Sequence, residues 1–108
     1  MALPRFDEGS LKQEVEELTK MLRTEEVLED LRSLLVRAGH DPHRILLAGF
    51  LENEEGFEGG VIVTPAHEIF RFERDDVADQ HFSTWERIEE VSTLLPMYPA
   101  LRVALEMA

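Results

Sequence analysis

The sequence has no cysteine, no long apolar run and few basic residues. Without cysteine, a disulfide scaffold, a thiolate metal site and a cysteine nucleophile are all excluded. The longest apolar run, Ile45 to Leu51, is too short to cross a bilayer as a helix. The N-terminal residues lack the basic and apolar regions of a signal peptide, so we expect a cytoplasmic protein with no membrane partner.

Only 11 lysines and arginines stand against 23 aspartates and glutamates, which gives a net charge of −12. Binding to nucleic acids and to anionic membranes depends on lysine and arginine, so this composition argues against both kinds of partner. It favours a basic protein partner instead. A length of 108 residues predicts one domain over residues 1–108.

The spacing of apolar residues predicts helices at both ends of the chain. Over residues 10–38 they recur every three or four positions, and Gly39 is a typical C-terminal stop. Helix-start signals near Thr24 allow either one long bent helix or two helices, and we favour the bend. Capping-box spacing predicts a helix over residues 83–95, and a short final helix follows from Pro99.

Between these helices, three segments read as strands joined by short connections: Ile45–Leu51, Val61–Thr64 and Glu68–Glu73. Short connections make neighbouring strands antiparallel, so we expect a three-stranded antiparallel meander with the helices packed on one face. This is an α+β fold of order α(α)-β-β-β-α-α. Either outer strand could pair with a second copy, which predicts a homodimer. The predicted core consists of Leu31, Leu35, Leu47, Ile62, Phe70, Phe72, Trp85 and Ile88.

One short segment concentrates acidic residues around an aromatic side chain. Residues 52–58 contain Glu52, Glu54, Glu55 and Glu58, no basic residue, and Phe57 among them. Exposed acids steer a basic partner, and an aromatic residue can supply the buried anchor of an interface. We therefore predict that these five residues form a partner-binding surface on which the four acids are uncompensated.

A second segment, His40-Asp41-Pro42-His43, holds two imidazoles and a carboxylate within four residues. These groups suit a divalent transition metal. The alternative hypothesis is therefore a small metal-dependent enzyme or metal-responsive domain. It would use His40 and His43 as ligands, with His67 or His81 as the third.

The sequence contains no Gly-x-Ser-x-Gly, no dinucleotide-binding glycine motif and no P-loop. Our leading hypothesis is therefore a non-catalytic interaction module that binds or neutralises a basic protein, as an inhibitor or a bacterial immunity-type protein would. A third hypothesis is a DNA-mimicking inhibitor, with carboxylates at phosphate-like spacing on one face.

Overall fold

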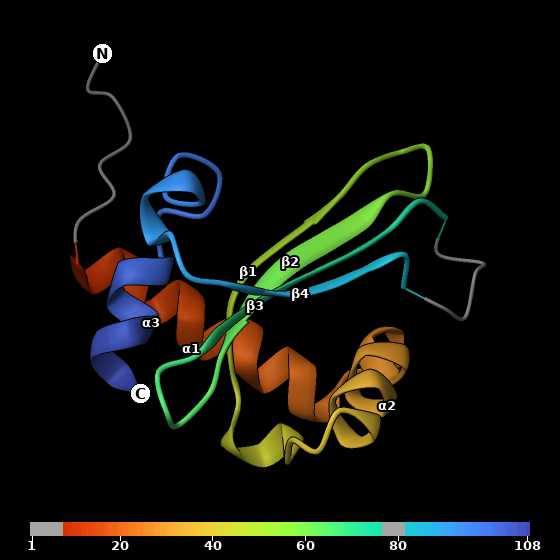
Figure 1. The fold of residues 1–108 in the computed structure, drawn as a ribbon, viewed down its shortest axis with the longest axis horizontal. Coiled ribbons are helices and arrows are strands. Elements are labelled where there is room, and N and C mark those ends of the chain that lie inside the picture. Colours follow the sequence, from red (N-terminus) through yellow and green to blue (C-terminus); the bar gives the residue numbers. More distant parts are fainter. Residues whose placement is uncertain (1–7, 77–81) are drawn as a thin grey trace.

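A four-stranded antiparallel sheet with helices on both faces forms the part of the protein that the structure describes (Figure 1). The structure is a computed structural model, and it describes residues 8–76 and 82–108. The helices are α1 Glu8–Thr24, α2 Glu29–Arg37 and α3 Leu101–Met107, with short 3-10 turns η1 Glu26–Leu28, η2 Pro42–Arg44 and η3 Val91–Thr93. The strands are β1 Leu46–Glu52, β2 Glu58–Val63, β3 Ile69–Arg74 and β4 Thr84–Ile88, in that order across the sheet. The α+β class is confirmed, but the sheet has a fourth strand that we did not predict.

The fourth strand replaces the first part of the helix predicted over residues 83–95, so that prediction is wrong. β4 pairs with β3, and Trp85 lies opposite Phe72. The rings of Phe70 and Trp85 stack with centroids 4.8 Å apart. Threonine, tryptophan and isoleucine favour strands, and this packing against β3 outweighs the local helix-start signal.

The first two helices are separate, so the favoured prediction of one bent helix is also wrong. Glu25 between them has an extended backbone with φ −86° and ψ 133°. Arg32 fixes this elbow, because its Nη1 donates to the carbonyl oxygens of Leu22 and Glu25, each at 2.7 Å. The predicted stop at Gly39 is confirmed, since its φ is 88°. None of the helices in the described residues is long and apolar enough to cross a membrane.

The sheet carries a hydrophobic cluster on each face, whereas we predicted helices on one face only. Ile62 packs with residues of α2 and the C-terminal part of α1, and its neighbours Val61 and Val63 pack with α3 and the N-terminal part of α1. Successive residues of a strand point to opposite faces, which is why one strand serves both clusters. Of the predicted core, the fully buried members are Leu31, Leu35, Leu47, Ile62 and Phe72, and the partly buried ones are Phe70, Trp85 and Ile88.

Helix α1 runs beside β1 and covers the outer edge of that strand. The buried hydroxyl of Thr19 accepts a hydrogen bond of 3.0 Å from the backbone N–H of Leu47. β3, the other strand predicted to lie at an edge, is internal because β4 pairs with it. Among the described strands, the open edge of the sheet is therefore that of β4.

Candidate functional site

An acidic pocket opens between the α1–α2 elbow and the sheet. Its volume is about 440 Å³, and we refer to it below as the acidic pocket. Five carboxylates, one guanidinium and one apolar side chain line it: Glu26, Glu29, Asp30, Glu52, Glu58, Arg74 and Val27. η1 and α2 supply one wall, and the ends of β1, β2 and β3 supply the other.

The floor of the acidic pocket is a buried ion pair. The side chains of Arg74 and Glu58 are only 3% and 5% exposed, and the Nη2 of Arg74 donates to both carboxylate oxygens of Glu58 at 3.2 Å. Its Nη1 donates to Asp30 at 2.9 Å, and the guanidinium lies 4.8 Å from the centroid of the Phe82 ring. The cation of the pocket is therefore already engaged by the protein itself.

Burial and pairing act in opposite directions on the pKa of each member of this pair. Burial raises the pKa of the Glu58 carboxyl, although Arg74 favours the charged form. Burial lowers the pKa of Arg74, but the hydrogen bonds to Asp30 and Glu58 and the attraction of their charges together outweigh it and raise that pKa overall, so the guanidinium stays charged.

The rim of the acidic pocket, in contrast, is exposed and not neutralised. Glu26, Glu29 and Glu52 are exposed, and none of them forms an ion pair with residues 8–76 or 82–108. Val27 stands among them with 70% of its surface exposed. Carboxylates arranged in this way can accept hydrogen bonds from ammonium or guanidinium groups.

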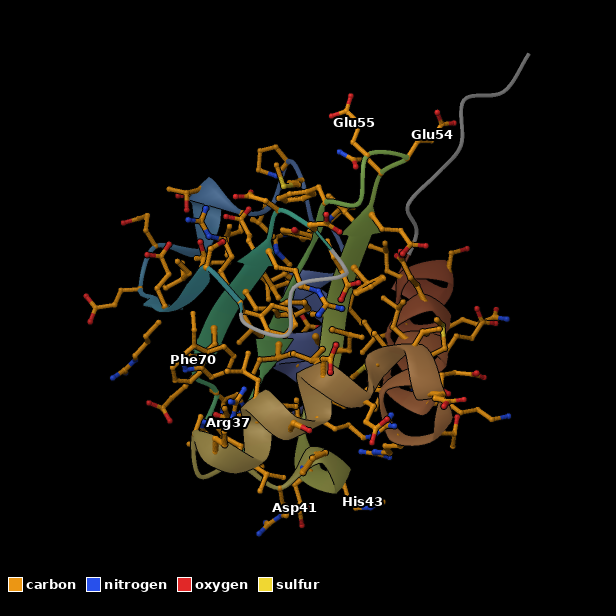
Figure 2. All side chains as sticks on the ribbon, turned by 90° about the vertical axis from the view of Figure 1, so that its right-hand side faces the viewer. Arg37, Asp41, His43, Glu54, Glu55 and Phe70 are labelled. Atoms are coloured by element: carbon orange, nitrogen blue, oxygen red, sulfur yellow. The ribbon has the colours of Figure 1, made fainter. Side chains whose placement is uncertain are left out.

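The predicted partner-binding residues occupy different parts of the β1–β2 hairpin. Glu54 and Glu55 are exposed at its tip, at the end of the molecule opposite Arg37 (Figure 2). The side chain of Asn53 stiffens the tip, because its Oδ1 accepts from the backbone N–H groups of Glu55 and Phe57 at 2.9 and 3.0 Å. Glu52 belongs to the acidic pocket instead of the tip.

Two of the five predicted residues are not exposed in the way that we expected. Glu58 is buried, and Arg74 compensates its charge, so the expectation of four uncompensated acids is wrong at this residue. Phe57 is half-buried, and its ring lies against Gly59. Because Phe57 and Glu58 are adjacent in an extended segment, their side chains point to opposite faces of the sheet.

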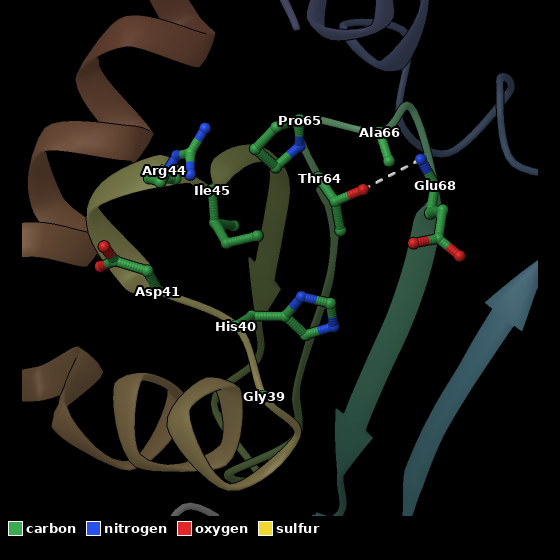
Figure 3. A pocket seen from close by; sticks show the side chains of 9 residues that line it. All are labelled: Gly39, His40, Asp41, Arg44, Ile45, Thr64, Pro65, Ala66 and Glu68. Carbon is green, nitrogen blue, oxygen red and sulfur yellow. Dashed lines mark hydrogen bonds between the residues drawn. The ribbon is translucent and has the colours of Figure 1, made fainter.

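The two histidines of the predicted metal site line different cavities. His40 borders a cavity of about 300 Å³ beside Thr64 and Glu68, and its side chain points to a different side from that of Asp41 (Figure 3). The centroids of the His40 and Phe70 rings are 5.4 Å apart. His43 borders another cavity, of about 620 Å³, on the outer side of α2.

The proposed third ligands add no support for a metal. His67 is exposed in the β2–β3 turn with φ 64°, and His81 lies outside the described residues. Within residues 8–76 and 82–108, no three histidine, aspartate or glutamate side chains converge as a metal site requires. The metal alternative stays a prediction.

Sequence reasoning missed Arg74, Asp30 and Val27. A signal for Arg74 was present, since alternation along β3 places it on the same face as Phe70 and Phe72, where an arginine needs an acidic partner. No comparable signal identified Val27, which the apolar spacing assigned to a buried helix face. Comparisons of the chain with protein-family models, curated proteins and solved structures found no match.

Proposed function

We propose that this protein is a non-catalytic interaction module that binds a basic segment of another protein in the acidic pocket. The observation that carries the proposal is the exposed Val27 among three carboxylates that form no ion pair with the described residues, those of Glu26, Glu29 and Glu52. Such a pairing of an apolar side chain with surrounding charge is typical of an interface anchor and its rim.

The internal ion pair supports this proposal. Arg74 is held by Glu58 and Asp30, so it does not neutralise the exposed rim. A lysine or arginine side chain of a partner would meet the carboxylates of Glu26, Glu29 and Glu52, whereas Arg74, the cation of the pocket, is held by Glu58 and Asp30. Charge of one sign also speeds the encounter with an oppositely charged partner.

The hairpin tip extends the same charge. Glu54 and Glu55 follow Glu52 along the chain and are exposed. We infer that they steer the partner at longer range, while Val27 takes the anchoring role that we first assigned to Phe57. Neutralisation of a basic protein, as by an inhibitor or immunity-type protein, would follow from covering its basic surface.

A labelled peptide of alternating arginine and leucine provides a direct test. We expect saturable binding, with amide chemical shifts changing around Val27. The double substitution Glu26→Gln with Glu52→Gln should weaken binding and flatten its dependence on salt, because exposed charges act mainly on association. Val27→Ala should instead speed dissociation, at a cost of about 1–2 kcal/mol.

The matched control removes two charges elsewhere. Glu14 and Glu106 are exposed on α1 and at α3, and neither is in an ion pair with the described residues. Replacing both by glutamine should leave the affinity unchanged. If both double variants weakened peptide binding equally, the effect would come from net charge alone, and a defined site would be refuted.

A further inference from the structure

A basic pocket lies on the outer side of α2, at the end of the molecule opposite the hairpin tip. Its volume is about 620 Å³, and we refer to it below as the basic pocket. The end of α1, the outer face of α2 and the turn η2 form its walls. Figure 2 shows Arg37 and His43 at this end, with Glu54 and Glu55 at the other. The lining residues that bear charge or a polar donor are Arg23, Glu29, Arg32, Ser33, Arg37 and His43.

The arginines of this pocket form no ion pair within the part of the chain that the structure describes. The ion pairs of the described residues engage Arg71, Arg74 and Arg87. Arg23 and Arg37 form no ion pair with residues 8–76 or 82–108, even though the chain has 23 acids for 11 bases. Acidic residues are twice as numerous as basic ones in the chain, yet the described residues that line this pocket include three arginines and one carboxylate.

The local structure holds this pocket in shape. Ser33 and Arg37 are four residues apart on α2, so they share the face that points away from the buried Leu31 and Leu35. Below them, Asp41 Oδ1 accepts a hydrogen bond of 2.9 Å from the backbone N–H of His43 and starts the turn η2.

Arg32 is fixed before any ligand binds. Its Nη1 is bonded to the carbonyl oxygens of Leu22 and Glu25 at the elbow. A side chain already held in one orientation loses little rotamer entropy when a ligand arrives. The site is in this respect preorganised.

The chemistry of the lining selects the ligand. Guanidinium groups match the geometry of phosphate oxygens, and a serine hydroxyl and an imidazole add further donors. Val36, which is 62% exposed, and Pro42 provide an apolar wall. The volume lies within the range of small-molecule sites, about 300–1,000 Å³. We propose that the basic pocket binds a small phosphorylated molecule, with the phosphate on Arg23, Arg32 and Arg37 and an apolar group against Val36 and Pro42.

Glu29 is the one carboxylate among the described residues that line the basic pocket, and it also borders the acidic pocket. It can accept a hydrogen bond from a hydroxyl or amino group of the same ligand. Apart from Glu29, this site shares no described lining residue with the acidic pocket of the proposed function. The experiments below use no residue of that pocket.

Phenyl phosphate is a suitable probe because it combines a doubly charged phosphate with an apolar ring. We expect it to cause saturable amide chemical-shift changes at Ser33, Arg37 and His43 at constant ionic strength. Inorganic phosphate should bind the same residues more weakly, and benzyl alcohol should not bind. Val36→Ser should reduce the advantage of phenyl phosphate over inorganic phosphate, since it removes part of the apolar wall.

Matched charge variants separate a defined site from general attraction. Replacing Arg23 and Arg37 by glutamine should weaken phenyl phosphate binding by about tenfold or more, the worth of lost charge-assisted hydrogen bonds. Replacing the exposed Arg44 and Arg102, which lie outside the basic pocket, removes the same charge and should leave binding within about twofold. The proposal would be overturned if phenyl phosphate binding did not saturate, or if both double variants weakened it equally. It would also be overturned if the protein bound a phosphoserine peptide but not phenyl phosphate.

Discussion

At the scale of single residues, Gly49 determines how one face of the sheet packs. A Cβ atom at this position would overlap the ring of Tyr98, which is itself buried. A glycine is therefore required where this ring lies against β1. We expect Gly49→Ala to lower the free energy of unfolding by about 1–3 kcal/mol, as overpacking does.

Chemical denaturation measures this effect, and a double-mutant cycle assigns its cause. In a Tyr98→Ala background, Gly49→Ala should cost much less, because the ring that it would overlap is gone. The same cost in both backgrounds would show that the ring is not responsible.

Glu58 matters at this scale because Arg74 depends on it. Without Glu58, the guanidinium of Arg74 would keep the partly exposed Asp30 but lose the carboxylate that is buried beside it. We expect Glu58→Ala to lower the free energy of unfolding by about 3 kcal/mol. Glu58→Gln keeps an acceptor for Arg74 and should cost clearly less. Urea unfolding compares the two variants, and a cost for alanine no larger than for glutamine would argue against the pair.

The pH dependence of stability follows from the same carboxyl group. Burial raises the pKa of Glu58, so the folded protein binds this proton more tightly than the unfolded chain does. Its contribution is fully present below the unfolded pKa and is lost as the pH rises through the folded pKa. We therefore expect the stability of the wild type relative to Glu58→Gln to fall from about pH 4 to about pH 7. Urea titrations of both proteins at both pH values test this direction. A rise in the relative stability of the wild type between about pH 4 and about pH 7 would contradict the prediction.

At the scale of elements, the contact between α1 and β1 depends on one buried hydroxyl. Thr19 accepts the N–H of Leu47, which lies on the outer edge of the sheet. Thr19→Val keeps the shape but leaves that N–H unsatisfied, and we expect a loss of about 1–3 kcal/mol in the free energy of unfolding. Thr24 is the matched control, because its hydroxyl is exposed and bonds within α1 to Lys20. Thr24→Val should have little effect, and equal losses would refute the edge contact.

At the scale of the whole molecule, the open edge bears on self-association. The homodimer predicted from the sequence stays a prediction. Because α1 covers the outer edge of β1, we expect β4 to be the strand that pairs between two copies, among the described strands. Light scattering at high micromolar protein concentration should give the mass of two chains. Proline substitutions on β4 should then give one chain, since proline disrupts strand pairing. A monomer mass for the wild type would contradict the prediction.

Charge is also organised at this scale. Although the net charge is −12, the surface carries one mainly basic and one mainly acidic pocket, and Glu29 lines both. We propose a basic protein as the partner of the acidic pocket and the hairpin tip, and a phosphorylated small molecule as the ligand of the basic pocket. The average composition, which argued against anionic partners, does not describe the surface around α2.

Local patterns in the sequence by themselves determined that the N-terminal segment is helical, that the second helix stops at Gly39 and that three strands follow, but neither the break at Glu25 nor the start of β2 at Glu58. At the end of α2 the deciding interaction joins residues close in the chain, because the N–H of His40 donates to the carbonyl oxygen of Leu35. Local patterns also identified Glu52, Glu54 and Glu55 as exposed acids.

Only the tertiary structure decided the identity of β4 and the composition of the candidate sites. Residues 84–88 carry helix and strand signals together, and pairing with β3 selects the strand. Glu58 is buried because Arg74, sixteen residues away in sequence, lies beside it across the β2–β3 pair. Both outcomes depend on contacts between distant segments, whose energies outweigh local propensity and are absent from any short window of sequence.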